Sequence, residues 1–166
     1  MENPSERIEA IQQAKKTDPD INLYILLNQV DDLIINAVEL ELKHLKVTQP
    51  QVRVLTMLSR EGRPVTLDEL AKWTFKEFNS VSTLINRMEK KGLIRKEKRE
   101  GDLKTYVALT EKGSTLYHEH ITERSIHLIF NALTAQEKEH LEAILDKLRD
   151  VTRGLLGLDY RPPFLP

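Results

Sequence analysis

The chain contains no cysteine, and no apolar run in it approaches the roughly 20 residues needed to span a bilayer. The lack of cysteine excludes disulfide bonds, cysteine-ligated zinc and thiol-based redox sensing, and it fits a reducing compartment. The first ten residues, MENPSERIEA, lack the basic start and apolar core of a signal peptide. We therefore expect a soluble, cytoplasmic protein with no membrane partner.

Motifs of the common enzyme classes are also missing. The sequence has no glycine-rich phosphate loop, no HExxH zinc motif and no cysteine nucleophile, and its serine–histidine pairs follow no recognisable frame. We therefore expect a protein that is not an enzyme, with no catalytic residues and no cofactor.

A metal site is an alternative that the histidines raise. His118 and His120 are two residues apart, so on a helix they point to different sides, whereas Glu119 with Glu123 and His120 with Glu123 have better spacing. Histidines exposed on the surface are the simpler interpretation, and we predict no metal. The histidines and acids concerned are Glu41, His44, His118, Glu119, His120 and Glu123.

What is present is a strongly charged globular composition. Of the 166 residues, 40% are apolar and 31% are charged, which suits one domain with its own core. From Thr48 to Thr110 there are 13 Lys and Arg against 8 Asp and Glu, a net charge of +5, and the rest of the chain carries −6. A basic middle between acidic ends predicts that the middle faces a polyanion.

The first part of the chain predicts helix. Residues 5–16 can form a short helix, and residues 21–46 have apolar side chains at helical spacing, with Asp20 able to cap the start. The apolar stripe of residues 21–46 is wider than one face. We therefore expect this helix to pack against two neighbours, one of them part of another subunit.

Three shorter helices and a hairpin follow. Thr48 and Thr66 begin the first two, the third is capped by Asn79 or Ser80, and Gly92 ends it. LIRKEKR and KTYVALT then alternate around EGD, with Gly101 at the tip, which predicts a β-hairpin. Helix is predicted again from Thr110 to residue 133 and from Thr134, whose capping box includes Glu137.

This order predicts a mainly α fold with a small β-hairpin wing. It is a winged helix-turn-helix with additional N- and C-terminal helices. The predicted divisions are an N-terminal extension (1–20), outer helices (21–46 and 111–156), a winged helix-turn-helix lobe (47–110) and a proline-rich tail (157–166).

The third short helix and the hairpin carry the predicted function. Val81, Leu84, Ile85 and Met88 form one apolar stripe, and the other side bears short hydrogen-bonding groups and cations, which suit base edges and phosphates in a major groove. A cationic hairpin suits a minor groove. A solvated surface is the alternative for each part alone. The predicted DNA-binding residues are Ser80, Ser82, Thr83, Asn86, Arg87, Lys90, Arg95, Lys96, Lys98, Arg99 and Lys104.

The segment SVSTLINRMEKKGLIRK…GDLKTYVALTEKG, preceded by TQPQVRVLTML and TLDELA, resembles the MarR family of bacterial transcription regulators. The resemblance covers roughly residues 21–156. It implies that the outer helices (21–46 and 111–156) are dimerisation helices, in a homodimer that binds a pseudo-palindromic, double-stranded DNA operator, usually as a repressor released by a ligand. Wings in this family usually carry Asp followed closely by Arg. Here Lys104 follows Asp102, so Lys104 and Arg99 are both candidates for the minor groove.

The resemblance also implies a small aromatic effector, bound between the dimer helices and the DNA-binding lobe. Packing in the core is the alternative for each candidate lining residue. Trp73 and Phe75 precede the recognition helix, so a ligand there can be coupled to its position. The candidates are Tyr24, Leu27, Trp73, Phe75, Phe78 and Tyr117.

A different function is a winged helix used for protein–protein contact, with only non-specific affinity for DNA. The amides and hydroxyls of the third short helix favour the regulator over this alternative. The proline-rich tail is expected either to contact the partner subunit or to be disordered.

Overall fold

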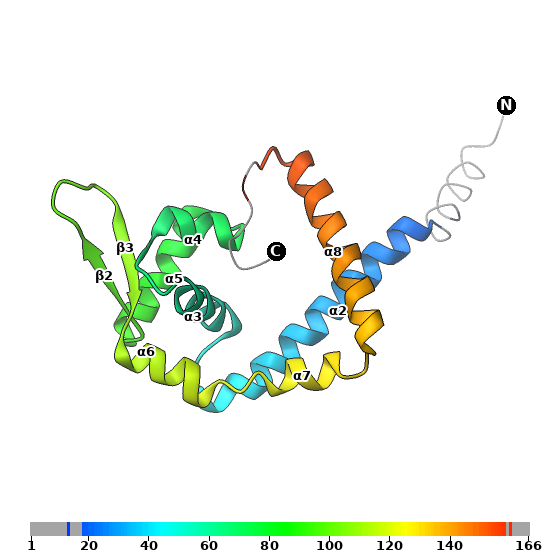
Figure 1. The fold of residues 1–166 in the computed structure, drawn as a ribbon, viewed down its shortest axis with the longest axis horizontal. Coiled ribbons are helices and arrows are strands. Elements are labelled where there is room, and N and C mark those ends of the chain that lie inside the picture. The colour runs from blue at the N-terminus through cyan, green and yellow to red at the C-terminus, as the bar shows by residue number, and fades with distance from the viewer. Residues whose placement is uncertain (1–12, 14–17, 159, 161–166) are drawn as a thin grey trace.

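The computed structural model describes residues 13, 18–158 and 160, and within them the predicted winged helix-turn-helix is confirmed (Figure 1). The short helix predicted for residues 5–16 and most of the proline-rich tail lie outside the described residues. The helices are α2 (Pro19–Leu42), η1 (Lys43–Leu45), α3 (Gln49–Glu61), α4 (Leu67–Thr74), α5 (Phe78–Lys90), α6 (Glu111–Thr115), the π-helical turn η2 (Leu116–His120), α7 (Arg124–Phe130) and α8 (Ala135–Leu155). The strands are β1 (Val65–Thr66), β2 (Ile94–Lys98) and β3 (Thr105–Leu109).

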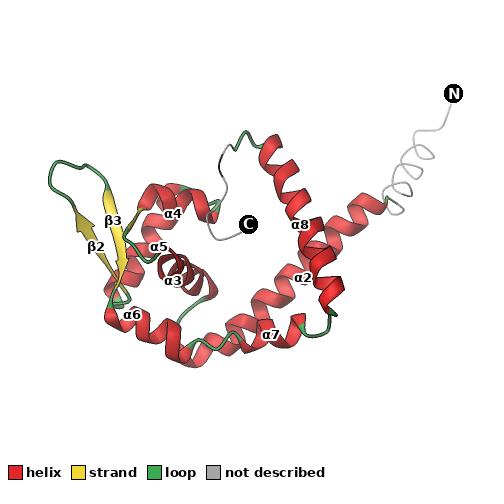
Figure 2. Ribbon diagram, in the orientation of Figure 1, coloured by secondary structure: helices red, strands yellow, loops and turns green. Residues whose placement is uncertain are grey.

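The wing is the predicted hairpin of β2 and β3, extended by a strand that the sequence did not predict (Figure 2). The sheet is antiparallel with the order β1-β3-β2. Strand β1 has only two residues, Val65 pairing with Val107 and Thr66 with Tyr106. Such a short strand has no alternation to detect, and only its pairing with β3 defines it. This pairing joins the wing to the start of α4.

The core of the lobe lies beneath α5. Val81, Ile85 and Met88 are buried, and Leu84 is partly buried, as the apolar stripe predicted. They pack in one cluster with apolar side chains of α3, α4, β2 and β3. Burying one face of α5 leaves its polar face outward, which is the orientation that a recognition helix needs.

Two predicted helix starts are confirmed by their capping boxes. In α4 the backbone N–H of Thr66 donates to Glu69 at 2.7 Å, and the N–H of Glu69 donates to the Thr66 hydroxyl at 3.2 Å. In α8 the N–H of Thr134 donates to Glu137 at 2.8 Å, and the reciprocal bond is 3.3 Å long. Local sequence determines these ends because both partners lie within one turn.

Two other predicted caps are wrong. Asp18, not Asp20, caps α2: its carboxylate accepts from the N–H groups of Asp20 and Ile21, and Pro19 occupies the first turn. Helix α5 begins at Phe78, before Asn79 and Ser80. The chain turns at Phe75, and the carbonyl of Glu77 already accepts from Ser80 and Val81.

The helix predicted to continue from Thr110 to residue 133 is interrupted. Ile121 is extended and Glu123 has a φ of +51°, so α7 starts afresh at Arg124. The cause is a tertiary contact: the carboxylate of Glu41 in α2 accepts hydrogen bonds from Thr122, Arg124 and Ser125. Desolvation raises the pKa of Glu41, but the hydrogen bonds from Ser125, Thr122 and Arg124 outweigh it and lower the pKa to about 2.

Helices α2 and α8 extend to one side of the lobe (Figure 1). Several of their apolar side chains are largely exposed, among them Leu33 (68%), Leu40 (73%) and Leu155 (83%). Isolated exposed leucines are ordinary, but a series of them along two helices marks a surface suited to association. Among the described helices, none combines the length and apolar character needed to cross a membrane.

Candidate nucleic-acid interface

The outward face of α5 carries the polar residues that the sequence analysis assigned to DNA. Thr83, Asn86, Arg87 and Lys90 are exposed, as is Ser80 in the first turn, while Ser82 is half-buried. The burial of Val81, Ile85 and Met88 holds this face away from the core. Hydroxyl, amide and guanidinium groups on one helical face can donate to and accept from base edges.

Lys96 joins this face to the wing. Its Nζ lies 3.0 Å from the Glu89 carboxylate and also contacts Oδ1 of Asn86. Lys96 was predicted as a DNA-binding cation of the hairpin, but here its charge is shared with Glu89. The same contact holds Asn86 in a set orientation and ties strand β2 to α5.

Arg95 is likewise engaged within the protein. Its Nε lies 2.7 Å from Glu97, and a terminal N–H donates to the carbonyl of Leu109 at 2.7 Å. These contacts direct the guanidinium along the sheet. The exposed cations closer to the hairpin tip are Lys98, Arg99 and Lys104.

Asp102 organises the tip of the wing. Its carboxylate accepts from the backbone N–H of Lys104 at 2.9 Å and from the Tyr106 hydroxyl at 2.8 Å. The N–H of Lys104 and then the Tyr106 hydroxyl lower the pKa of Asp102, and the same hydrogen bond raises the pKa of Tyr106. Arg99 lies over the Tyr106 ring at 3.9 Å from its centroid. Tyr106 was not among the predicted DNA-binding residues, because its place in an alternating strand is that of an ordinary β-sheet residue.

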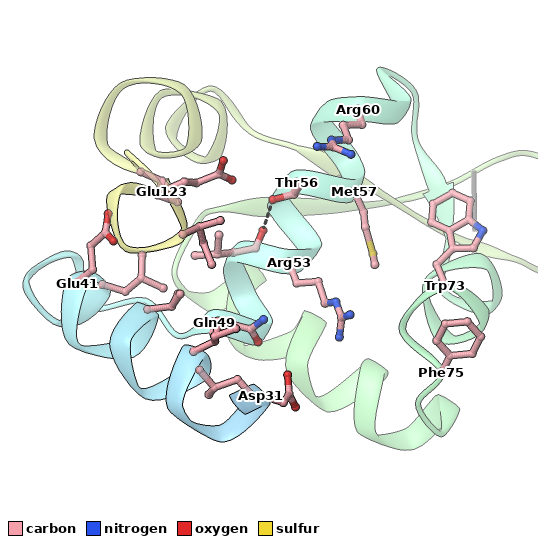
Figure 3. Close-up of a pocket in the computed structure, with 17 residues that line it drawn as sticks. Asp31, Glu41, Gln49, Arg53, Thr56, Met57, Arg60, Trp73, Phe75 and Glu123 are labelled. Atoms are coloured by element: carbon pink, nitrogen blue, oxygen red, sulfur yellow. Dashed lines mark hydrogen bonds between the residues drawn. The ribbon is translucent and has the colours of Figure 1, made fainter. Parts of the chain in front are cut away.

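A pocket of about 350 Å³ lies where α2, α3 and the end of α4 meet (Figure 3). Of the predicted ligand-binding residues, Trp73 and Phe75 line it. Figure 3 shows Asp31 of α2 and Arg53 of α3 on one side and the Trp73 and Phe75 rings on the other. Arg53 was not among the predicted ligand-binding residues, because an exposed cation on α3 gives no sequence signal of a pocket.

The other predicted ligand-binding residues lie elsewhere. Leu27 lines a second pocket of about 620 Å³, between α8 and the turn after α4, and shares it with Phe75. Tyr24 and Phe78 are exposed, and Tyr117 is half-buried beside the core. Tyr24, Phe78 and Tyr117 line neither pocket.

The histidines considered for a metal make other contacts. The ring of His44 is hydrogen-bonded to the carbonyl of Glu41 at 2.7 Å, and that of His118 to the Ser59 hydroxyl at 3.1 Å. Across residues 18–158, with residues 13 and 160, no three histidine or acidic side chains are arranged to hold a metal ion.

Three helices under a β-hairpin wing, with a polar helix face beside a cationic tip, define a winged helix-turn-helix protein. The sequence profile of the MarR family matches residues 45–104. The organohalide-sensing transcriptional regulator RdhR-CbdbA1625, in its ligand-free crystal structure, is 30% identical, with 85% of each chain covered and a TM-score of 0.77. The chain therefore belongs to the MarR family of transcription regulators.

Other solved structures have the same fold. AbsC, a MarR family regulator from Streptomyces coelicolor, is 25% identical, with 83% of this chain and 97% of AbsC covered and a TM-score of 0.76. A mutant of E. coli MarR in complex with operator DNA is 23% identical, with 81% of this chain and 96% of MarR covered and a TM-score of 0.72, a likeness of fold. No curated protein matches the sequence significantly.

Proposed function

We propose that this protein is a homodimeric, sequence-specific transcription regulator that binds a pseudo-palindromic DNA operator. Helix α5 enters the major groove and the β2–β3 wing reaches the minor groove. The observation that carries this proposal is the continuity of the exposed polar face of α5 with the exposed cations Lys98, Arg99 and Lys104 of the wing. Amides and hydroxyls supply base readout, and the wing supplies cations for phosphates and a narrow groove.

The dimer is supported by the apolar side chains exposed along α2 and α8, such as Leu33, Leu40 and Leu155. Their burial against a second copy is favourable, at about 25 cal/mol per Å² of apolar surface. In such a dimer the two copies of α5 enter successive major grooves, about 34–36 Å apart.

The proposed effector is a small aromatic molecule that binds in the pocket lined by Trp73 and Phe75 and weakens operator binding. The protein itself is proposed to be a repressor, which this effector releases from the operator. The position of this pocket supports the proposal, because its wall includes Phe75 in the turn directly before α5. A structure of the organohalide-sensing relative contains 2,4-dichlorophenol, a compound of this class.

A selection from random DNA followed by anisotropy titration tests the central proposal. We expect the selection to return a palindromic site that binds at least ~10³-fold more tightly than scrambled DNA. The DNA upstream of the coding region is then titrated at two salt concentrations. Selection of no site, with equal affinity for all sequences, would instead favour a winged helix used for contact with another protein.

A further inference from the structure

Tyr160, which follows α8 in the sequence, lies against the DNA-binding lobe. Helix α8 ends in a Schellman turn, in which the N–H of Leu158 donates to the carbonyl of Arg153 at 2.9 Å and the N–H of Gly157 to that of Gly154 at 3.2 Å. Gly157 has a φ of +65°, which a residue with a Cβ adopts only at a cost. The chain changes direction at this turn, and Tyr160 lies at the end of α4.

Tyr160 makes three contacts, two with Lys72 of α4 and one with Phe75, the C-cap residue of α4. Its hydroxyl donates a hydrogen bond to the carbonyl of Lys72. Its ring stacks on Phe75, with centroids 5.9 Å apart and planes inclined by 22°, and the Lys72 ammonium lies 5.9 Å from the Tyr160 centroid. The hydroxyl is a proton donor at neutral pH, as in any tyrosine, and burial raises the pKa of Tyr160 further.

Phe75 is the residue whose conformation these contacts hold. It caps α4 with a φ of +53°, a left-handed conformation that is unfavourable for a residue with a side chain. Such a conformation persists where the surroundings hold it in place. The N–H of Phe75 donates to Lys72, the carbonyl that also accepts from Tyr160. The carbonyl of Lys72 thus accepts hydrogen bonds both from the turn after α4 and from Tyr160.

The turn at Phe75 directs the recognition helix. Helix α5 begins three residues later, and within the described structure its N-cap residue, Glu77, makes no capping bond through its side chain. The backbone from Phe75 to Glu77 therefore contributes to the starting direction of α5, together with the buried side chains of this helix. Phe75 also lines the pocket formed with α2 and α3, so one ring separates that pocket from Tyr160.

We propose that Tyr160 is a positioning residue for DNA binding: by stacking on Phe75 and bonding to Lys72, it links the end of α8 to the turn that sets the direction of α5. This inference rests on the proposed function, in which α5 reads the operator. It adds that the C-terminal segment of the same chain orders the recognition helix without contacting DNA.

The test compares chains that end on either side of this residue. A chain ending at Leu158 lacks Tyr160, and a chain ending at Tyr160 keeps it and serves as the matched control. Tyr160→Ala removes the ring and Tyr160→Phe only the hydroxyl. Trp73, the single tryptophan of the protein, lies in α4 next to Lys72, so its emission reports on this turn without DNA.

We expect Tyr160→Ala and the chain ending at Leu158 to bind the selected operator about tenfold more weakly, from the loss of one aromatic pair and one hydrogen bond. Both should shift or quench Trp73 emission, while their thermal midpoints stay near that of the unaltered protein. For Tyr160→Phe and for the chain ending at Tyr160, the affinity for the operator should fall by about threefold at most.

Two results would overturn the proposal. One is unchanged Trp73 emission and unchanged affinity in Tyr160→Ala. The other is equal loss in the two shortened chains, which would assign the effect to residues beyond Tyr160. If the unaltered protein selects no operator, the proposed function fails, and the emission of Trp73 still reports whether Tyr160 orders the turn.

Discussion

The backbone N–H of Ser125 lies 2.7 Å from the carboxylate of Glu41, although the two residues are 84 positions apart. Glu41 thereby caps the first turn of α7, where a negative charge also interacts favourably with the helix dipole. The contact joins α2, which precedes the lobe in the sequence, to α7, which follows it. It therefore contributes to the relative placement of the lobe and the helices proposed for dimerisation.

Glu41→Gln should lower the free energy of unfolding at pH 7. The folded pKa of Glu41, about 2, lies below the ordinary glutamate pKa of 4.5, so the carboxylate stabilises the fold above pH 4.5 and loses this effect as the pH falls toward 2. We expect a loss of about 1–2 kcal/mol, reduced from the full linkage value because the carboxylate is partly exposed. Urea denaturation of both proteins at fixed concentration, from pH 7 to pH 3, measures it.

The difference between the two proteins should shrink as the pH falls through this range. Glu142→Gln, an exposed acid on α8, is the control and should change little. A difference that stays constant with pH would mean that the charge of Glu41 does not stabilise α7.

Arg87→Ala and Lys98→Ala should weaken DNA binding in different ways. Arg87 is exposed on α5 and is expected to contact a base, so its loss should cost roughly 1–3 kcal/mol at the operator and little on scrambled DNA. Lys98 is exposed on the wing and is expected to contact a phosphate. Its loss should weaken all sequences alike and reduce the salt slope by about 0.9.

Anisotropy titrations of operator and scrambled DNA over a series of salt concentrations separate these effects. Lys147→Ala, on the exposed surface of α8, matches the change of charge away from the proposed interface and should leave both affinities unaltered. If Arg87→Ala and Lys147→Ala bound operator and scrambled DNA with equal affinity, α5 would not be part of the DNA interface.

Glu89→Gln should strengthen DNA binding. Glu89 forms an ion pair of 3.0 Å with Lys96 at the junction of α5 and the wing. Removing its charge frees Lys96 for a phosphate and removes a repulsion from the DNA backbone. We expect an increase of about twofold to fivefold, as for the loss of one surface ion pair, with a steeper salt dependence. A titration showing weaker binding would mean that the pair serves to orient Asn86.

Gly113→Ala should destabilise the lobe. A Cβ at Gly113 would lie 1.9 Å from the carbonyl oxygen of Leu93, so α6 would have to move away from the backbone of Leu93, just before β2. We expect a loss of about 1–3 kcal/mol or more in chemical denaturation. Gly154→Ala is the matched control: a Cβ there meets nothing within 4 Å, and alanine favours helix by up to about 1 kcal/mol. Equal stability of the two variants would contradict the close packing at Leu93.

Much of the fold was predictable because its signals are local. The capping boxes of Thr66 and Thr134, the stripe of Val81, Ile85 and Met88, and the tip at Gly101 each involve residues within a few positions of one another. Local rules failed where a distant group competed. The continuous helix predicted from Thr110 is interrupted because Glu41 offers its N–H groups a partner that the sequence around them does not contain.

The same division holds for the proposed site. Periodicity and charge were enough to put the polar groups of α5 on one face and the cations on a hairpin, because these placements follow from backbone geometry. Which cations are engaged within the protein was decided by tertiary contacts: Lys96 by Glu89 from α5, and Arg95 by the carbonyl of Leu109 in β3. Tyr160 reaches Phe75 only because the whole lobe and α8 bring together residues 85 positions apart. Local backbone geometry can be predicted from neighbouring residues in the sequence, whereas these long-range contacts depend on how the helices and strands pack together.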